Sequence, residues 1–369
     1  MMKAYFDELV AGIEGSLAGD LQAASPRKRY ALEVARLGRR LYGGRERVAW
    51  CGVTAPFDLL AAMGVTSCFV EFVGAMLATT GMAGSFLEKA ERAGLAGDTC
   101  GYHRAVLGAA REGLMPEPDF LVATSSPCSG GLAVMENLAR HFGRDLFVLH
   151  VPQEASPAGV RYLADQMREL AAFVSAHTGE PLDRERLAAA VGHTNAARER
   201  MAEVFRLAAR TPSPANGKVL GNFGIVMALL LGTPAGEAVA RAYRDDFRAR
   251  AERGAPGVPG ERRRLLWIQN RIQFKHPLIE LLEQDYGAVV VADELNAITW
   301  EPIDPAEIGR LYRLYMAAGM PLSLGDQARY LLAMDLGRWE LVVRTGFWRE
   351  LWRRRWFPVV GSATLRFRR

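Results

Sequence analysis

Two of the four cysteines, Cys100 and Cys128, lie in settings that suit a metal centre. Cys100 opens a tight turn followed by an amphipathic helical pattern. Cys128 follows the apolar run 120–123, and a helix is expected to begin near Gly131. Thiolates are soft metal ligands, and the backbone dipoles at a helix start favour their charged form. Because ligand sites collect at the carboxyl ends of strands in open α/β sheets, we expect the two thiols to converge on one metal centre.

The plainer interpretation of a free cysteine is a small buried hydrophobe. Spacing alone does not decide the matter for Cys100 and Cys128, because they do not form a Cys-x-x-Cys pair. For the other two cysteines, Cys51 and Cys68, we predict the structural role, since both lie within apolar runs of strand length.

Polar residues next to the two cysteines extend the candidate site. His103 can donate a hydrogen bond to a metal-bound sulfur or bind a metal, but a solvated side chain fits its position equally well. Ser129 can donate to a metal-bound sulfur, and it can equally cap a helix. A zinc ion held by Cys100, Cys128 and His103 is a further alternative.

The elements that must position these residues alternate between strand and helix. In the first half, apolar runs of strand length are separated by helical patterns; they span 48–53, 65–70, 120–123 and 146–151. Two further strands are expected at 264–269 and 288–292. This alternation predicts an α/β fold with parallel sheets and helices on both faces. We expect two such units facing each other across a cleft, with an N-terminal helical lead and long connecting helices.

Changes in composition divide the chain into four parts. The predicted boundaries give a helical lead, a first α/β domain with its connecting helices, a second α/β domain and an Arg/Trp-rich tail; they are 1–44, 45–215, 216–335 and 336–369. The linker Thr211–Gly217, which reads TPSPANG, separates the two α/β domains.

The net charge of +5 is compatible with a nucleic-acid-binding protein, but the excess of positive charge lies in the tail. Residues 336–369 contain nine arginines and two glutamates, so the rest of the chain carries 37 basic and 39 acidic side chains. We therefore expect neither nucleic-acid nor membrane binding, because the body is not basic and no apolar run is long enough to span a bilayer. Four cysteines without an apolar leader predict a reducing, cytoplasmic compartment.

Several segments together resemble a known family. They are Cys100-Gly-Tyr-His-Arg104 with Gly108, Cys128 after an apolar strand, and the stretches VAWCGVTAPFDLLAAMG (48–64) and GAVVVADE (287–294). This ordered set is similar to the 2-hydroxyacyl-CoA dehydratase family, which also contains the benzoyl-CoA reductase subunits. The resemblance covers roughly residues 45 to 335.

The resemblance implies a subunit of a radical acyl-CoA dehydratase, a hydro-lyase of anaerobic metabolism. Members pair with a homologous second subunit as a heterodimer, and each subunit commonly holds a [4Fe–4S] cluster through three cysteines. A separate ATP-dependent activator delivers single electrons, and the cluster passes one to an acyl-CoA thioester for water elimination. Cys100 and Cys128 match the first two ligands, with Ser129 and His103 near the cofactor.

The family pattern also calls for a third cysteine, and the sequence has none after Cys128. One hypothesis is a shift of reading frame near Asp335; the other is a genuine divergence in how a cluster is held. Two alternatives to the dehydratase therefore stay open. One is a subunit of a benzoyl-CoA-type reductase, and the other is a cluster-free partner subunit that completes a complex.

Overall fold

The computed structural model describes most of the chain up to the second sheet. The described residues are 2–17, 25–126, 128–152, 157–217, 219–220, 229–267, 277–293 and 359–360. The helices before the second sheet are α1 Met2–Ser16, α2 Pro26–Leu41, α3 Phe57–Ala62, α4 Val70–Thr79, α5 Ala83–Arg92, α6 Gly101–Arg111, α7 Ser129–Phe142, α8 Pro157–Thr178, α9 Arg184–Ala208 and α11 Pro234–Glu252. The strands of the first sheet are β1 Arg47–Cys51, β2 Val65–Phe69, β3 Phe120–Thr124 and β4 Leu146–Leu149.

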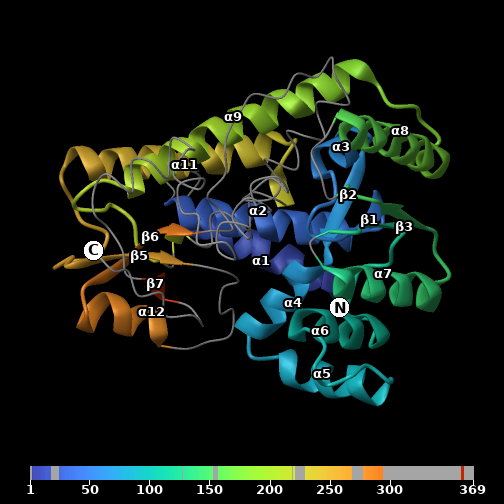
Figure 1. Ribbon diagram of the computed structural model, residues 1–369, viewed down its shortest axis with the longest axis horizontal. Helices are drawn as coiled ribbons and strands as arrows, with labels where there is room; N and C mark the ends of the chain where they lie inside the picture. The colour runs from blue at the N-terminus through green and yellow to red at the C-terminus, as the bar shows by residue number, and fades with distance from the viewer. Residues whose placement is uncertain are drawn as a thin grey trace.

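The first sheet has four parallel strands in the order β2-β1-β3-β4 (Figure 1). Ala49 of β1 pairs with Ser67 of β2 on one side and with Phe120 of β3 on the other. The chain leaves β1 through α3 to reach β2, and it leaves β3 through α7 to reach β4. These connections run in opposite directions along the sheet, so the strand order reverses between β1 and β3. Ligand sites of open α/β sheets lie at such a reversal.

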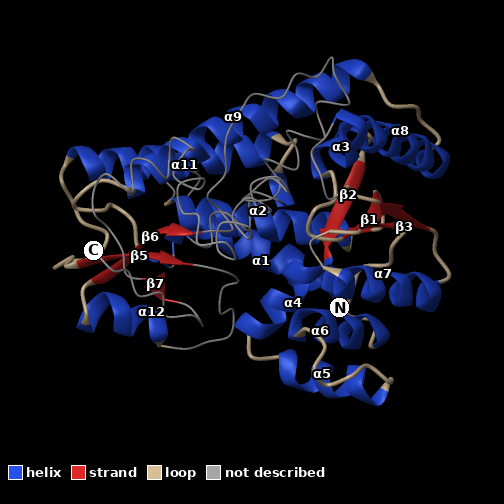
Figure 2. Cartoon of the chain, in the orientation of Figure 1, coloured by secondary structure: helices blue, strands red, loops and turns tan. Residues whose placement is uncertain are grey.

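Different helices cover the two faces of this sheet. Because successive side chains of a strand point to opposite faces, β1 contributes to two separate cores. Ala49 and Cys51 lie in a core shared with α3, α8, α9 and α11. Val48 and Trp50 lie in the opposite core, shared with α4, α5, α6 and α7. Helices therefore lie on both sides of the strands (Figure 2), which confirms the predicted α/β class with a helical lead and parallel strands.

The second sheet is smaller and also parallel. Its strands, in the order β6-β5-β7, are Ala288–Asp293, Arg263–Trp267 and Val359–Val360. The sequence also predicts a helix over 276–286, before β6. Within that range the structure has the short α12, Leu278–Glu280, followed by a π-helical turn, Leu281–Asp285. Further helices are predicted from the sequence at 305–318 and 325–334. These two ranges, Asp335 and the Arg/Trp-rich tail apart from β7 lie outside the described residues.

Long helices connect the two sheets, as predicted. Helix α8 has 22 residues and α9 has 25. The sequence predicts a break in the helical stretch near 178–181, and the structure has one between α8 and α9. Asp183 caps α9 by accepting a hydrogen bond from the Arg186 N–H at 2.8 Å. Helix α9 packs along α11, and both run above the second sheet in Figure 1.

A buried carboxyl group joins α3 to α9. Asp58 is fully buried, and it accepts hydrogen bonds from the Leu59 N–H at 2.9 Å and from Thr194 Oγ1 at 3.3 Å. Burial raises the pKa of Asp58 from 3.8 to about 6; the hydrogen bonds and the charge of Arg198 oppose this rise. The folded chain therefore keeps this proton at pH values where the unfolded chain has lost it.

This shift predicts that Asp58 makes the fold less stable as pH rises from about 4 to about 6. Relative to Asp58→Asn, the free energy of unfolding of the wild type should fall by about 2 kcal/mol between pH 4.5 and pH 7. Urea unfolding of both proteins at the two pH values measures the difference. Asp165→Asn, at an exposed carboxylate paired with Arg168, is the control. Parallel pH profiles for the wild type and Asp58→Asn would rule out the shift.

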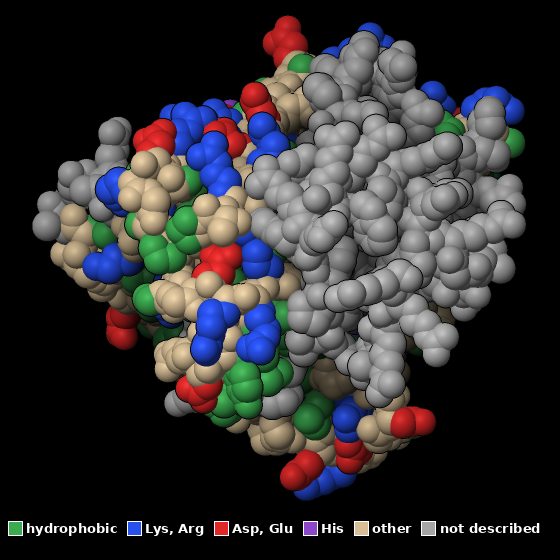
Figure 3. All heavy atoms as spheres, turned by 60° about the vertical axis from the view of Figure 1, so that its left-hand side comes forward, with side chains coloured by type: hydrophobic (Ala, Val, Ile, Leu, Met, Phe, Trp, Pro, Cys, Tyr) green, Lys and Arg blue, Asp and Glu red, His purple; other side chains and the backbone are tan. Residues whose placement is uncertain are grey.

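Figure 3 shows one side of the molecule. On the described part of this face, Lys and Arg side chains are interspersed with Asp and Glu side chains and with hydrophobic ones. Among the described helices, none combines the length and the apolar character needed to cross a bilayer.

Candidate functional site

At the carboxyl edge of the first sheet, hydrogen bonds connect the segments that follow β1 and β3, where the strand order reverses. Thr54, in the loop after β1, and Thr124, at the end of β3, share a short hydrogen bond through their hydroxyl groups. The carbonyl oxygen of Ser126 lies within hydrogen-bond distance of both hydroxyls, at 2.9 Å from Thr54 and 2.6 Å from Thr124, so the two hydroxyl protons are shared among these three oxygens. These bonds fix the loop that leads from β3 to Cys128. The sequence offered no motif that pointed to the threonines.

Cys100 occupies the N-cap position of α6, and its side chain is exposed. The Arg104 N–H donates to the Cys100 carbonyl at 3.1 Å, which closes the first turn of the helix. The Arg104 side chain pairs with Glu91 and donates to the Thr99 carbonyl. It therefore stabilises the loop before Cys100.

Cys128 occupies the N-cap position of α7 and is also exposed. Its Sγ accepts a hydrogen bond from the Gly131 N–H at 3.4 Å. The thiol itself therefore caps the helix, and Ser129 is the first helical residue rather than the cap. Ser125, earlier in the same loop, accepts a hydrogen bond from the Val151 N–H at 2.8 Å and so joins the loop to the segment that follows β4.

His103 brings the first turns of α6 and α7 together. It is 4% exposed, so the solvated side chain considered for this residue was wrong. The ring packs against the first turn of α7: a Cβ atom at Gly130 would lie 3.4 Å from Nδ1, and one at Gly131 would lie 3.5 Å from Nε2. Both thiols therefore lie at the start of helices whose first turns touch. The first turn of a helix presents free N–H groups that favour anionic ligands.

Glu71 also lies in this region, next to His103, and we did not predict it from the sequence. It lies in the first turn of α4, directly after β2, and its Oε1 is 3.6 Å from His103 Nε2. The signal was present in the sequence, because Glu71 is the sole charged residue in the apolar stretch 65–77. A charge placed at the carboxyl end of a buried strand marks a functional candidate.

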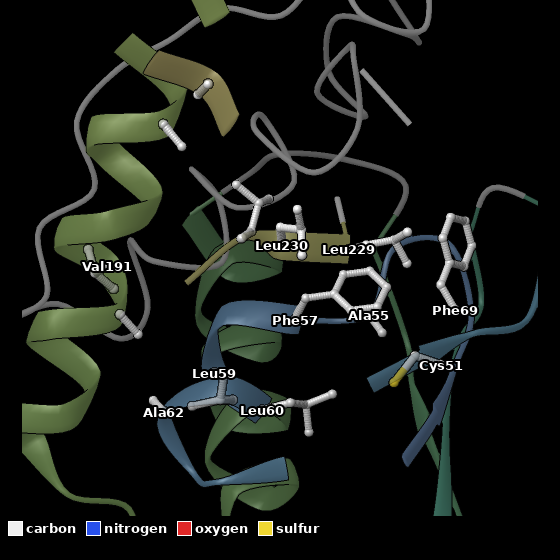
Figure 4. Packing of buried hydrophobic residues seen from close by; sticks show 14 of the residues in the cluster. Cys51, Ala55, Phe57, Leu59, Leu60, Ala62, Phe69, Val191, Leu229 and Leu230 are labelled. Atoms are coloured by element: carbon white, nitrogen blue, oxygen red, sulfur yellow. The ribbon is translucent and has the colours of Figure 1, made fainter. Parts of the chain in front are cut away.

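Cys51 and Cys68 are buried, as predicted, on neighbouring strands. They belong to different cores, so their side chains lie on opposite faces of the sheet. Figure 4 shows the Cys51 side chain among the apolar residues that include Ala55 and Phe69. Burial raises the pKa of both thiols, that of Cys68 to about 12. Neither thiol is available to a ligand without leaving its core.

The exposed thiols fit part of an iron–sulfur site. Cys100 and Cys128 supply two soft donors at touching helix starts, the Gly131 N–H already bonds to one sulfur, and His103 Nδ1 is buried without a hydrogen-bond partner among the described residues. No three His, Cys, Asp or Glu side chains in the described part of the chain converge closely enough to bind a single metal ion. The structure therefore gives no support to zinc held by the two cysteines and His103.

The region that holds these residues is similar to known proteins. A family model described as 2-hydroxyglutaryl-CoA dehydratase, D-component, matches residues 52–334. The chain is also 25% identical to lactoyl-CoA dehydratase subunit alpha of Anaerotignum propionicum over 246 residues, which are 60% of this chain and 58% of that protein. The chain thus matches less than two thirds of the length of this relative. Both candidate cysteines, Glu71 and His103 lie within the range of the family match.

Proposed function

This chain belongs to the 2-hydroxyglutaryl-CoA dehydratase D-component family, and we propose that it is the iron–sulfur subunit of a radical 2-hydroxyacyl-CoA dehydratase. The observation that carries the proposal is the placement of its two exposed thiols. Cys100 and Cys128 occupy the N-cap positions of two helices whose first turns touch, beside the reversal point of a parallel sheet. Soft sulfur donors at such a position suit an iron–sulfur cluster.

The residues of the proposed site divide into those that bind iron and those that surround the sulfurs. Cys100 and Cys128 would hold a [4Fe–4S] cluster through their thiolates, with Ser129 and His103 beside it. A bound cluster would supply a single electron to the acyl-CoA thioester. The net reaction would remove water from a 2-hydroxyacyl-CoA to give an enoyl-CoA, and the electron would be returned, which makes the enzyme a hydro-lyase.

The proposed enzyme needs two other proteins. A homologous second subunit would complete a heterodimer, and the designation "subunit alpha" of the Anaerotignum propionicum relative supports a multisubunit assembly. An ATP-dependent activator would deliver the electron. All four cysteines are free thiols, which supports a reducing, cytoplasmic location.

Anaerobic turnover tests this function. The chain, co-purified with its second subunit, is mixed with the activator, ATP and a reductant, and then offered a series of 2-hydroxyacyl-CoA thioesters. We expect formation of an enoyl-CoA from at least one of them, dependent on ATP and reductant and lost in a complex carrying Cys128→Ser. Reduction of benzoyl-CoA in place of water elimination would instead assign the chain to the reductase branch. Elimination that is unchanged by Cys128→Ser would refute the proposed role of the thiol.

A further inference from the structure

We infer that Thr54 and Thr124 are positioning residues of the candidate site, whose hydroxyl groups hold the loop that ends at Cys128 and so keep its thiol at the start of α7. This role rests on the hydrogen bonds of the two threonines and of the loop. Its effect on a bound cluster rests in addition on the proposed iron–sulfur function.

The protons of both threonine hydroxyls are used within the loop. Thr54 is 1% exposed and Thr124 is 5% exposed, so their hydroxyl groups need partners inside the protein. The Ser126 carbonyl, which lies 2.9 Å and 2.6 Å from the two hydroxyl oxygens, can only accept. Because the hydroxyl oxygens also contact each other, one proton must lie between them and the other must go to the carbonyl. Neither hydroxyl therefore keeps a proton to donate to a ligand, which assigns the pair a positioning role and not a catalytic one.

The two threonines follow neighbouring strands of the first sheet. Thr124 is the last residue of β3. Thr54 lies in the turn after β1, which the Ala55 N–H closes by donating to the Gly52 carbonyl at 3.1 Å. The Gly52 N–H in turn donates to the Val122 carbonyl at 3.0 Å, which continues the pairing of β1 with β3. The sheet therefore fixes both hydroxyl groups before the loop to Cys128 begins.

The same loop is held on its other side by the segment around the end of β4. The Ser125 N–H donates to the Leu149 carbonyl at 3.0 Å, and Ser125 Oγ accepts from the Val151 N–H at 2.8 Å. Two residues of chain span at most about 7 Å, so Cys128 must lie within about that distance of Ser126. Hydrogen bonds on both sides of the loop therefore restrict where the Cys128 thiol can lie.

The position of the Cys128 thiol can be followed through the first turn of α7. Its Sγ accepts a hydrogen bond from the Gly131 N–H at 3.4 Å, and its extended backbone, with φ −143° and ψ 145°, is typical of an N-cap residue. This hydrogen bond is kept only while the loop holds Cys128 at the start of the helix. Loss of a threonine hydroxyl should therefore expose the Gly131 N–H to water.

Amide hydrogen exchange tests the positioning role in the full-length chain without iron. Thr54→Val and Thr124→Val keep the shape of the side chain and lose the hydroxyl. We expect each of them to speed exchange at Gly131 about tenfold, because the amide loses its partner. Exchange at Leu138, in the middle of α7, should stay unchanged, because the effect is confined to the first turn. Thr54→Ser and Thr124→Ser keep the hydroxyl and should restore the wild-type rate.

Thr79→Val is the matched control, because it removes a hydroxyl that donates to the Ala75 carbonyl at 2.9 Å within α4. It should leave exchange at Gly131 at the wild-type rate. Wild-type exchange at Gly131 in both valine variants of the loop threonines would overturn the inference. Equal acceleration at Leu138 would overturn it as well, because a general loss of stability would then be the cause. Serine variants that exchange as fast as the valine variants would show that the hydroxyl groups do not hold the loop.

The EPR spectrum of the reduced, iron-loaded complex tests the effect on the cluster, with the spectrum of the second subunit alone subtracted. A ligand sulfur that moves changes the geometry around its iron, so the g values of Thr124→Val should differ from those of the wild type. Thr124→Ser should restore them. Wild-type g values in Thr124→Val would overturn the effect on the cluster. A chain that binds no iron but shows the expected exchange at Gly131 would contradict the iron–sulfur function and uphold the positioning of Cys128.

Discussion

Replacing either exposed cysteine by serine, as Cys100→Ser or Cys128→Ser, is expected to abolish cluster binding. Serine has nearly the shape of cysteine, but its hydroxyl is a hard, weakly acidic donor where iron–sulfur clusters take thiolates. Iron in the anaerobically purified complex should fall by about four atoms per chain if the whole cluster is lost. Turnover of any 2-hydroxyacyl-CoA should disappear with it. Iron and sulfide analysis, together with low-temperature EPR of the reduced protein, measures the loss.

The buried cysteines supply the control for this experiment. Cys51→Ala and Cys68→Ala remove thiols that lie in the two cores of the first sheet. These variants should be modestly less stable, by about 1–2 kcal/mol, because each leaves a small cavity. They should keep their iron. Loss of iron from Cys51→Ala or Cys68→Ala, together with retention of iron in Cys100→Ser and Cys128→Ser, would show that Cys100 and Cys128 are not the ligands.

Gly108→Ala is expected to have the largest effect on stability. Helix α6, which begins next to Cys100, packs against α5 with almost no space between the backbones. A Cβ atom at Gly108 would overlap the carbonyl oxygen of Phe86 and lie 2.8 Å from its carbonyl carbon. Backbone cannot move aside as a side chain can, so α5 and α6 must separate. We expect a loss of about 3 kcal/mol or more in the free energy of unfolding, measured in urea.

A second glycine shows whether this loss comes from packing. Gly84 lies in α5, and no atom lies within 4 Å of the position that its Cβ would take. Gly84→Ala should leave stability unchanged or raise it by up to about 1 kcal/mol, because alanine favours a helix more than glycine does. Equal effects of the two substitutions would show that the close approach of α5 and α6 is not what makes Gly108 necessary.

The sequence was sufficient to predict the elements that carry the site. Alternating strand and helix patterns located β1 to β4, and apolar runs identified Cys51 and Cys68 as core residues, because periodicity and burial are local consequences of residue type. Cys128 was expected before a helix that begins near Gly131, and the observed helix begins two residues earlier, since the thiol itself is the cap. Element boundaries of this kind depend on single hydrogen bonds, which composition does not reveal.

The polar contacts of the site were not predictable in the same way. His103 is buried because α4 and α7 both pack against the start of α6, and the partner it finds there, Glu71, is 32 positions away in the sequence. The bond between Thr54 and Thr124 spans 70 positions. Such pairs are set by strand order, and the order β2-β1-β3-β4 does not follow from the spacing of residues. The arrangement of the two α/β units across a cleft remains a prediction, as does the division of the chain into four parts.

Whether this chain binds an iron–sulfur cluster is decided by the iron and acid-labile sulfide content of the wild-type chain, purified under strict anaerobiosis with its second subunit. We expect about four irons and four sulfides bound per copy of this chain, as one [4Fe–4S] cluster. The second subunit, purified alone, supplies the value to subtract. No iron on this chain after reconstitution with iron and sulfide would contradict the account and assign the chain to the cluster-free partner role.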